Sequence, residues 1–128
     1  MAYNFMAQFA DDVAAGSKSL TIREHRKGRS RHARAGELVQ LYTGMRTRHC
    51  RKLVTPDPIC EVVRPILFLR KGPLDCAVVL NAVELTHDQL DYLIVADGFL
   101  SRSAFFDFHL GNHYEIEKIF IKWGFWND

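Results

Sequence analysis

The sequence predicts a single α+β domain over residues 1–128, with the strands arranged as a small mixed barrel flanked by short helices. Three observations favour this fold class. Apolar residues follow a helical period near the N-terminus and again after residue 86, whereas most segments between them alternate with the period of two that strands show. The apolar content of 48% and the charged content of 25% are ordinary for a globular chain. The length suffices for one modest core and not for two.

The first predicted helix is short and ends at a glycine. Phe5, Phe9 and Val13 recur every fourth residue and form the apolar stripe of an amphipathic helix. Gly16 is expected to end this helix, because glycine readily takes the left-handed conformation that satisfies the last helical carbonyl groups. The chain can then reverse direction within a few residues.

The strand predicted after this turn carries two polar side chains on one face. Leu20 and Ile22 alternate toward the core, so Thr21 and Arg23 share the opposite face. Lys18 would lie on the face opposite Thr21 if it belonged to the same strand. It reaches Thr21 only if it still lies in the turn. The alternative is a surface lysine and a solvent-facing threonine.

The rest of the chain predicts further strands and two more helices. Strands are expected at residues 37–42, 60–70, 77–85 and 113–125, with a basic strand or loop at 46–53. Thr86 and Gln89 match a capping box, so a helix begins there and ends near Asp97. Ser101 begins a second short helix, which Gly111 ends. This order of elements fits a small barrel with helices beside it, although composition alone supports only the α+β class.

Composition also limits compartment and cofactor. No apolar run is long enough to cross a bilayer, and the amphipathic N-terminal segment is unlike a signal peptide, so a cytoplasmic protein without a membrane partner is expected. Three cysteines at irregular spacing argue against a disulfide framework. A zinc site could be imagined from His49, Cys50, Cys60 and Cys76, but no C-x-x-C or suitably placed H-x-x-x-H supports it. No metal or other cofactor is predicted.

Positive charge is concentrated in one quarter of the chain. Ten of the 17 lysines and arginines lie between residues 23 and 52, where the acids are Glu24 and Glu37. Such clustering is typical of a surface that binds phosphates, and a solvated loop is the alternative. The loop over residues 24–35 follows the motif strand directly and could close over a ligand held there. The candidates for binding the substrate are Arg23, Arg26, Lys27, Arg29 and Arg31.

The motif at the first turn resembles that of a known family. The pattern G-x-K-x-x-T-x-R, after a phenylalanine-containing helix that ends in acidic residues, reads FADDVAAGSKSLTIR here and is similar to the signature of the ASCH domain family. The similarity continues through Ala35–Val39 and more weakly over residues 85–110. This resemblance implies a PUA-like fold and a modified nucleoside or RNA as the partner.

The resemblance also implies a reaction and a set of catalytic residues. Members of the family include an amidohydrolase that removes acetate from N4-acetylcytidine, with a lysine, a threonine and a glutamate in its site. The lysine and threonine fall on Lys18 and Thr21. The glutamate falls on Asp97, whose side chain is one methylene shorter. Glu24 and Asp107 are the alternatives for this acid.

The chemistry of such a site is coherent. A threonine hydroxyl attacks an amide only when a base stands beside it. Lysine serves as that base if burial and nearby cations lower its pKa from ~10.4 toward neutrality, and Arg23 with the basic loop would supply cations. The carboxylate of Asp97 works in the opposite sense. It would therefore orient Lys18 or protonate the leaving amine, and the sequence leaves both roles open.

Two other functions use the same features. A non-catalytic RNA-binding module of PUA-like fold would need the basic loop without the lysine and threonine of the motif. The family has also been linked to ribonuclease activity, for which His25, His32 or Lys18 would supply acid and base groups. Trp123 and Trp126 are candidates to stack on a base, and core packing is the alternative for an aromatic residue in a final strand.

Overall fold

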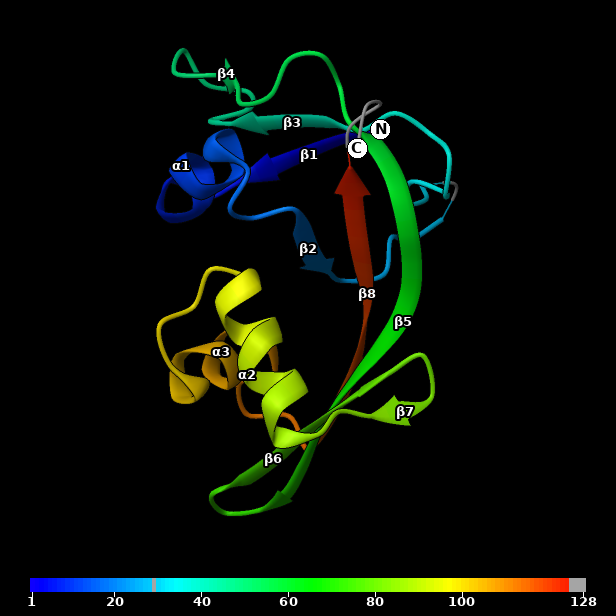
Figure 1. The fold of residues 1–128 in the computed structure, drawn as a ribbon, viewed down its shortest axis with the longest axis vertical. Coiled ribbons are helices and arrows are strands. Elements are labelled where there is room, and N and C mark those ends of the chain that lie inside the picture. The colour runs from blue at the N-terminus through cyan, green and yellow to red at the C-terminus, as the bar shows by residue number, and fades with distance from the viewer. Residues whose placement is uncertain (29, 125–128) are drawn as a thin grey trace.

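The computed structural model of the protein describes residues 1–28 and 30–124, which form two β-sheets and three helices (Figure 1). The smaller sheet has the order β1 (Ala2–Phe5), β3 (Gln40–Thr43) and β4 (Arg51–Lys52). The larger sheet has the order β2 (Leu20–Arg23), β8 (Glu115–Gly124), β5 (Ile59–Gly72), β6 (Asp75–Leu80) and β7 (Val83–Glu84). The helices are α1 (Ala7–Ala15), α2 (His87–Ala96) and α3 (Arg102–His109). The predicted α+β class is confirmed.

The described strands do not close into the barrel that the sequence predicts. A single antiparallel bridge, from Leu38 to Ile59, links the segment before β3 to the start of β5. β2 pairs with β8 and β1 pairs with β3, and the strand ladders given for residues 1–28 and 30–124 contain no pairing between β1 and β2. A side chain connects them instead, because Arg23 Nη2 donates to the backbone oxygen of Asn4 at 2.7 Å.

The N-terminal segment is a strand, and the first helix begins later than predicted. Ala2–Phe5 pairs in parallel with Gln40–Thr43, and its residues Tyr3 and Phe5 are buried. The predicted helical stripe from Phe5 is therefore wrong at its first residue, and α1 begins at Ala7. Backbone pairing with a strand distant in sequence outweighed the local helical period.

One predicted strand is a hairpin. The apolar run expected as a single strand over 77–85 turns at Asn81 and Ala82, whose φ angles are 52° and 67°. Two successive left-handed residues are the geometry of the tight turns that match the twist of paired strands. The run is therefore divided into β6 and β7, which pair with each other.

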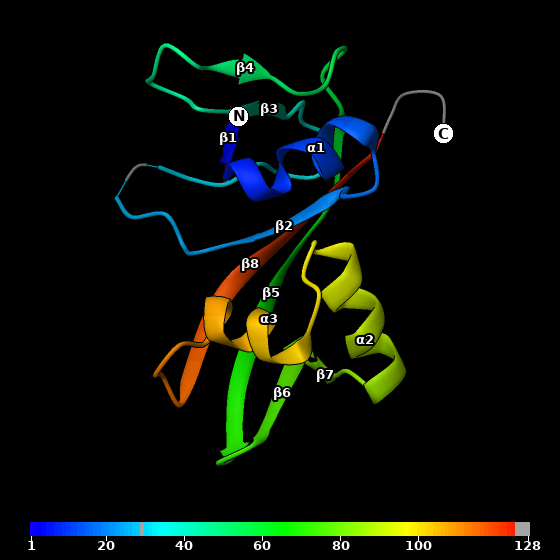
Figure 2. The same ribbon diagram turned by 90° about the vertical axis from the view of Figure 1, so that its left-hand side faces the viewer.

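Local sequence signals predict correctly where α1 ends and where α2 and α3 begin. Gly16 ends α1 with φ 85°, and its N–H donates to the oxygen of Val13. Thr86 and Gln89 form both hydrogen bonds of the capping box at the start of α2, and Ser101 caps α3. Figures 1 and 2 show α2 and α3 against one face of the larger sheet. No helix among the described residues is both long and apolar enough to cross a membrane.

Candidate functional site

Lys18 lies in the turn between α1 and β2, which is the position that the sequence requires if Lys18 is to reach Thr21. Its backbone N–H donates to the oxygen of Asp12 at 3.0 Å, which holds the chain in the turn after Gly16. The side chain points inward and is 3% exposed. Its ammonium lies 5.1 Å from the centre of the Phe9 ring. The surface-lysine interpretation is therefore wrong.

Asp97 contacts Lys18 from the end of α2, a part of the chain distant in sequence. It is the C-cap residue directly after α2, and its Oδ1 accepts from Lys18 Nζ at 2.6 Å while its backbone oxygen accepts from the same nitrogen at 2.8 Å. The aspartate is 2% exposed. Gly98 follows with φ 91°, and a Cβ there would lie 2.9 Å from the Phe9 ring. This close approach brings the end of α2 against α1 and so places the two charges together.

These two hydrogen bonds determine how Lys18 can act. A neutral lysine amine carries two N–H groups and one lone pair. When both N–H groups donate to Asp97, only the lone pair of Nζ is left to interact with another group. In the charged form, the third N–H occupies that position. The two contacts with Asp97 thus fix the position of Lys18 Nζ at the cavity wall.

Thr21 and Arg23 share one face of β2, as their alternation predicts. Arg23 Nε donates to Thr21 Oγ1 at 2.9 Å. The guanidinium also lies 4.8 Å from the centre of the Phe5 ring. An N–H donor on the hydroxyl oxygen favours its ionised form, because hydrogen bonds to a charged state stabilise that state.

His109 and Lys118 extend the polar cluster, and sequence reasoning did not select them. His109 Nε2 lies 2.7 Å from Asp97 Oδ2, and its Nδ1 lies 3.4 Å from Lys118 Nζ. Both side chains are buried. A neutral imidazole protonated at Nε2 would donate to the carboxylate and accept from the ammonium. Lys18, Asp97, His109 and Lys118 thus form one hydrogen-bonded chain.

A signal for Lys118 was present in the sequence. Ile116 and Phe120 alternate on one face of the last strand, and Lys118 stands between them where an apolar residue is expected. His109 had no comparable signal. It is part of a short helix, and its stacking on Phe68 at 4.9 Å depends on the tertiary structure.

Burial shifts the pKa values of these groups toward their neutral forms. It lowers the pKa of Lys18 below 10.5; the Asp97 carboxylate opposes this shift and the Arg23 cation adds to it. Burial likewise lowers the pKa of His109 below 6.5, with Asp97 opposing and both lysines adding. The pKa of Lys118 is also lowered by burial, while Glu24 and Asp97 oppose that change. Burial therefore disfavours the charged forms of both lysines and of His109, and Asp97 opposes this effect.

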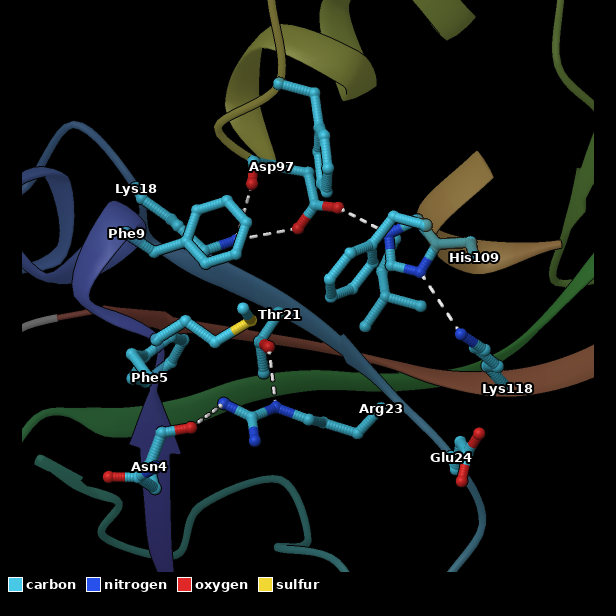
Figure 3. A pocket seen from close by; sticks show the side chains of 14 residues that line it. Asn4, Phe5, Phe9, Lys18, Thr21, Arg23, Glu24, Asp97, His109 and Lys118 are labelled. Atoms are coloured by element: carbon cyan, nitrogen blue, oxygen red, sulfur yellow. Dashed lines mark hydrogen bonds and ion pairs between the residues drawn. The ribbon is translucent and has the colours of Figure 1, made fainter. Parts of the chain in front are cut away.

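A cavity of about 300 Å³ opens beside this chain (Figure 3). Lys18, Thr21, Arg23, Asp97, His109 and Lys118 all line it, and so does Glu24, one of the alternatives for the acid. Aromatic rings form its apolar walls: Phe5, Phe9, Phe99 and Phe108. This volume lies at the small end of the range of ~300–1,000 Å³ for ligand sites. Its lining thus combines apolar aromatic walls with a cluster of polar and charged side chains.

The basic loop is tied to the body of the protein. Arg26 donates to the oxygens of Ala2 and Arg31, and Arg31 makes a bidentate pair with Glu37 at 2.7 and 2.8 Å. Neither arginine lines the cavity. Lys27 is exposed, and Arg29 lies outside the described residues. Of the predicted substrate-binding residues that the structure describes, Arg23 alone lines the cavity.

The other candidates lie away from this cavity. His25 pairs with Glu117, and His32 stacks on Tyr3, so neither histidine lines it. Trp123 is 2% exposed and belongs to the core, and Trp126 lies outside the described residues. Asp107 lines a separate depression and not the cavity. Within residues 1–28 and 30–124 there is no group of three or more His, Cys, Asp or Glu side chains that could hold a metal ion.

Comparisons of the chain with family models, with curated proteins and with solved structures found no match.

Proposed function

We propose that this protein is an amidohydrolase that removes acetate from N4-acetylcytidine or a related acylated cytosine. The observation that carries the proposal is the 2.6 Å contact between Lys18 and Asp97 on the wall of the cavity that Thr21 also lines. The motif supplies the lysine from the turn after α1 and the threonine from β2, and the residue after α2 supplies the acid, 79 residues after Lys18 in the chain. This arrangement supports the set of three residues that the resemblance to the ASCH family implies.

In the first step, the Thr21 hydroxyl adds to the acetyl carbonyl carbon. Its proton passes to the lone pair of neutral Lys18, whose orientation Asp97 holds. The C–O bond forms and the carbonyl oxygen becomes an oxyanion. Arg23 has five N–H donors, of which Thr21 and Asn4 use two in the described structure, so the remaining ones can stabilise this charge.

In the second step, the oxyanion collapses and the bond from carbon to N4 breaks. Lys18, now an ammonium, returns its proton to the departing amine, and cytidine leaves. Water then attacks the acetyl-threonine ester, again with Lys18 as the base. The ester bond breaks, the Thr21 oxygen regains its proton and acetate leaves.

His109 and Lys118 act on this reaction through Asp97. The imidazole holds the second carboxylate oxygen, so the first one remains directed at Lys18. Lys118 in turn favours the imidazole form that donates to Asp97, because its ammonium occupies the side of Nδ1. Both are positioning residues in this proposal.

The PUA-like fold and the cytoplasmic location remain part of the proposal. A non-catalytic RNA-binding module is the competing function, and it gives no reason for a buried lysine and aspartate beside a threonine. Burying two charges is unfavourable unless they are paired and hydrogen-bonded, so their position in a cavity favours a chemical role.

The test is incubation of the purified protein with N4-acetylcytidine, followed by chromatography for cytidine and acetate. We expect cytidine to accumulate with the wild type and not with Asp97→Asn. Asp107→Asn, which changes an exposed aspartate outside the cavity, is the matched control and should keep full turnover. Absence of cytidine with folded wild-type protein would refute the proposed activity.

A further inference from the structure

The turn that joins β3 to β4, together with β4 itself, carries three exposed arginines that make no ion pair with the residues that the structure describes. We call residues 44–52 the basic hairpin. Its cations are Arg46, Arg48, Arg51 and Lys52, all exposed, and the sequence has no acidic residue between Glu37 and Asp57. Lys52 pairs with Asp57 at 2.7 Å. The three arginines have no ion pair or hydrogen bond from their side chains within residues 1–28 and 30–124.

Several surface cations elsewhere are paired with carboxylates. Lys71 pairs with Glu84, Arg102 with Asp91 at 2.8 Å, and Lys122 with Glu61 at 3.2 Å. Arg31 in the loop before β3 pairs with Glu37. Lys27, Arg34 and Arg64 are also exposed and make no ion pair within residues 1–28 and 30–124, so what distinguishes the hairpin is that three such arginines lie within six residues of the chain. Their fields reach solvent without a neighbouring negative charge to cancel them.

The backbone of the basic hairpin is held in a defined turn. Gly44 and Arg46 both have φ 65°, and Thr47 binds the oxygen of Gly44 through its N–H and its hydroxyl. The N–H of His49 donates to the same hydroxyl at 3.1 Å. A Cβ at Gly44 would lie 2.8 Å from the oxygen of His49, so the turn is closely packed. A fixed turn presents its arginines with little ordering cost on binding.

One end of the basic hairpin contacts a residue that lines the cavity. β1 and β3 run in parallel with Phe5 opposite Thr43, so the residues after Thr43 lie beside those after Phe5. The N–H of Met45 donates to Asn4 Oδ1 at 2.9 Å, and Thr43 donates to the oxygen of Phe5 at 2.8 Å. Asn4 and Phe5 line the cavity. In Figure 1 the chain between β3 and β4 lies at the end of the smaller sheet where β1 also ends.

We infer that the basic hairpin binds the phosphodiester backbone of a single-stranded nucleic acid whose acylated cytosine enters the cavity. Arginine suits phosphate because its planar group donates two parallel hydrogen bonds. A base inside a duplex cannot reach a buried site, so the strand must be single or the base must be extruded. A membrane surface fits less well, since no large apolar side chain is exposed within residues 44–52 to insert into lipid.

The identity of the base that enters the cavity rests on the proposed deacetylation. The assignment of the basic hairpin as the surface that binds the backbone does not depend on that reaction. The variant to test is Arg46→Gln, Arg48→Gln and Arg51→Gln together. The matched control is Lys71→Gln, Arg102→Gln and Lys122→Gln, which removes the same charge from paired sites. The probe is a labelled single-stranded RNA of about 12 nucleotides, within the usual site sizes of ~4–16. The other probes are the acetylated form of this RNA, DNA of the same sequence and phosphatidylserine vesicles.

Binding is measured at several salt concentrations. Neutralising a phosphate changes the slope of log K against log salt by ~0.7 per contact on a single strand, so the hairpin variant should lower the slope by about 2. The control should keep the wild-type slope. Turnover of acetylated RNA by the hairpin variant should fall together with binding. Turnover of the free nucleoside by the same variant is the internal reference for its catalytic activity. Comparison of RNA with DNA identifies which backbone is bound.

The outcomes separate this inference from the proposed activity. An unchanged slope in the hairpin variant, an equal loss in the control, or wild-type binding to vesicles without binding to either nucleic acid would overturn the inference. If the nucleoside is still hydrolysed in that case, the proposed activity survives. If the basic hairpin binds RNA but no acetylated substrate is hydrolysed, the surface stands and the proposed reaction fails.

Discussion

The cavity and the basic hairpin are connected through Asn4, and both contain several cations, but the environments of these cations are opposite. In the cavity, Lys18 and Lys118 are buried, each has a hydrogen-bond partner, and burial lowers both of their pKa values. In the basic hairpin the arginines face water and have no partner among the described residues. The same type of charge is thus found in two different environments.

This difference in environment determines which region can transfer a proton. Proton transfer at neutral pH needs a group whose pKa has been moved toward that pH, and this requires desolvation or close charges. Exposed arginines keep their charge and act by attraction over a distance that salt limits to about 10 Å at 0.1 M. We therefore expect chemistry to depend on the cavity and affinity for polyanions to depend on the basic hairpin.

The largest effect should come from the catalytic set. Thr21→Ala, Lys18→Ala and Asp97→Asn should each lower turnover of N4-acetylcytidine by ~10²–10⁴-fold, because each removes a partner of one proton-transfer unit. Combining them should add little. Steady-state kinetics gives the answer, and nucleoside affinity should change much less than turnover. Near-normal turnover in any of the three would remove that residue from the mechanism.

Asp97→Glu tests how far turnover depends on the length of the acidic side chain. If Asp97 is the counterpart of the family's glutamate, the longer side chain should keep a substantial part of the activity, whereas Asp97→Asn loses it. Turnover should also fall as the pH is lowered through the pKa of Lys18, because the protonated amine cannot accept a proton. A flat pH profile from below to above neutrality would exclude Lys18 as the base.

The next effect concerns Gly98 and stability. Gly98 and Gly16 both have positive φ angles, 91° and 85°, but a Cβ at Gly16 would meet open space while one at Gly98 would meet Phe9 at 2.9 Å. Gly16→Ala should lower the free energy of unfolding by about 1–2 kcal/mol through backbone strain alone. Gly98→Ala should cost a further ~1–3 kcal/mol through overpacking and should displace Lys18 from Asp97. Urea unfolding measures both, and equal losses would mean that the contact is unimportant.

His109 gives a prediction for acid stability. Its pKa is lowered in the fold, so below pH 6.5 the unfolded chain takes up a proton that the folded chain does not. Stability should therefore fall as the pH drops from 6.5 toward the folded pKa, and this part of the fall should disappear in His109→Gln. His109→Leu should cost about 1–3 kcal/mol at every pH because Asp97 Oδ2 loses its donor. An unchanged acid limb in His109→Gln would contradict a neutral buried imidazole.

The smallest effect should come from the basic loop. Arg26→Gln, Lys27→Gln and Arg31→Gln together remove as much charge as the hairpin variant, but two of these side chains already bind groups of the protein. The slope of RNA affinity against salt should therefore change little, and thermal stability should fall slightly. A decrease in slope as large as that of the hairpin variant would show that the loop binds the backbone after all.

Several features followed from short stretches of sequence, because their causes are local. Gly16 ends its helix through its own backbone freedom, and Thr86 with Gln89 caps the next helix within four residues. The common face of Thr21 and Arg23 follows from alternation along one strand. The density of positive charge between residues 23 and 52 is likewise a property of the sequence alone.

Tertiary structure decided the rest, because burial and pairing join residues distant in the chain. The strand at Ala2–Phe5 exists through its pairing with β3, and the pairing of Lys18 with Asp97 spans 79 residues. His109 enters the site only because α3 packs on Phe68. Which arginines remain free also depended on the fold, since a carboxylate such as Glu37 neutralises one cation and leaves another exposed according to where the folded backbone places it.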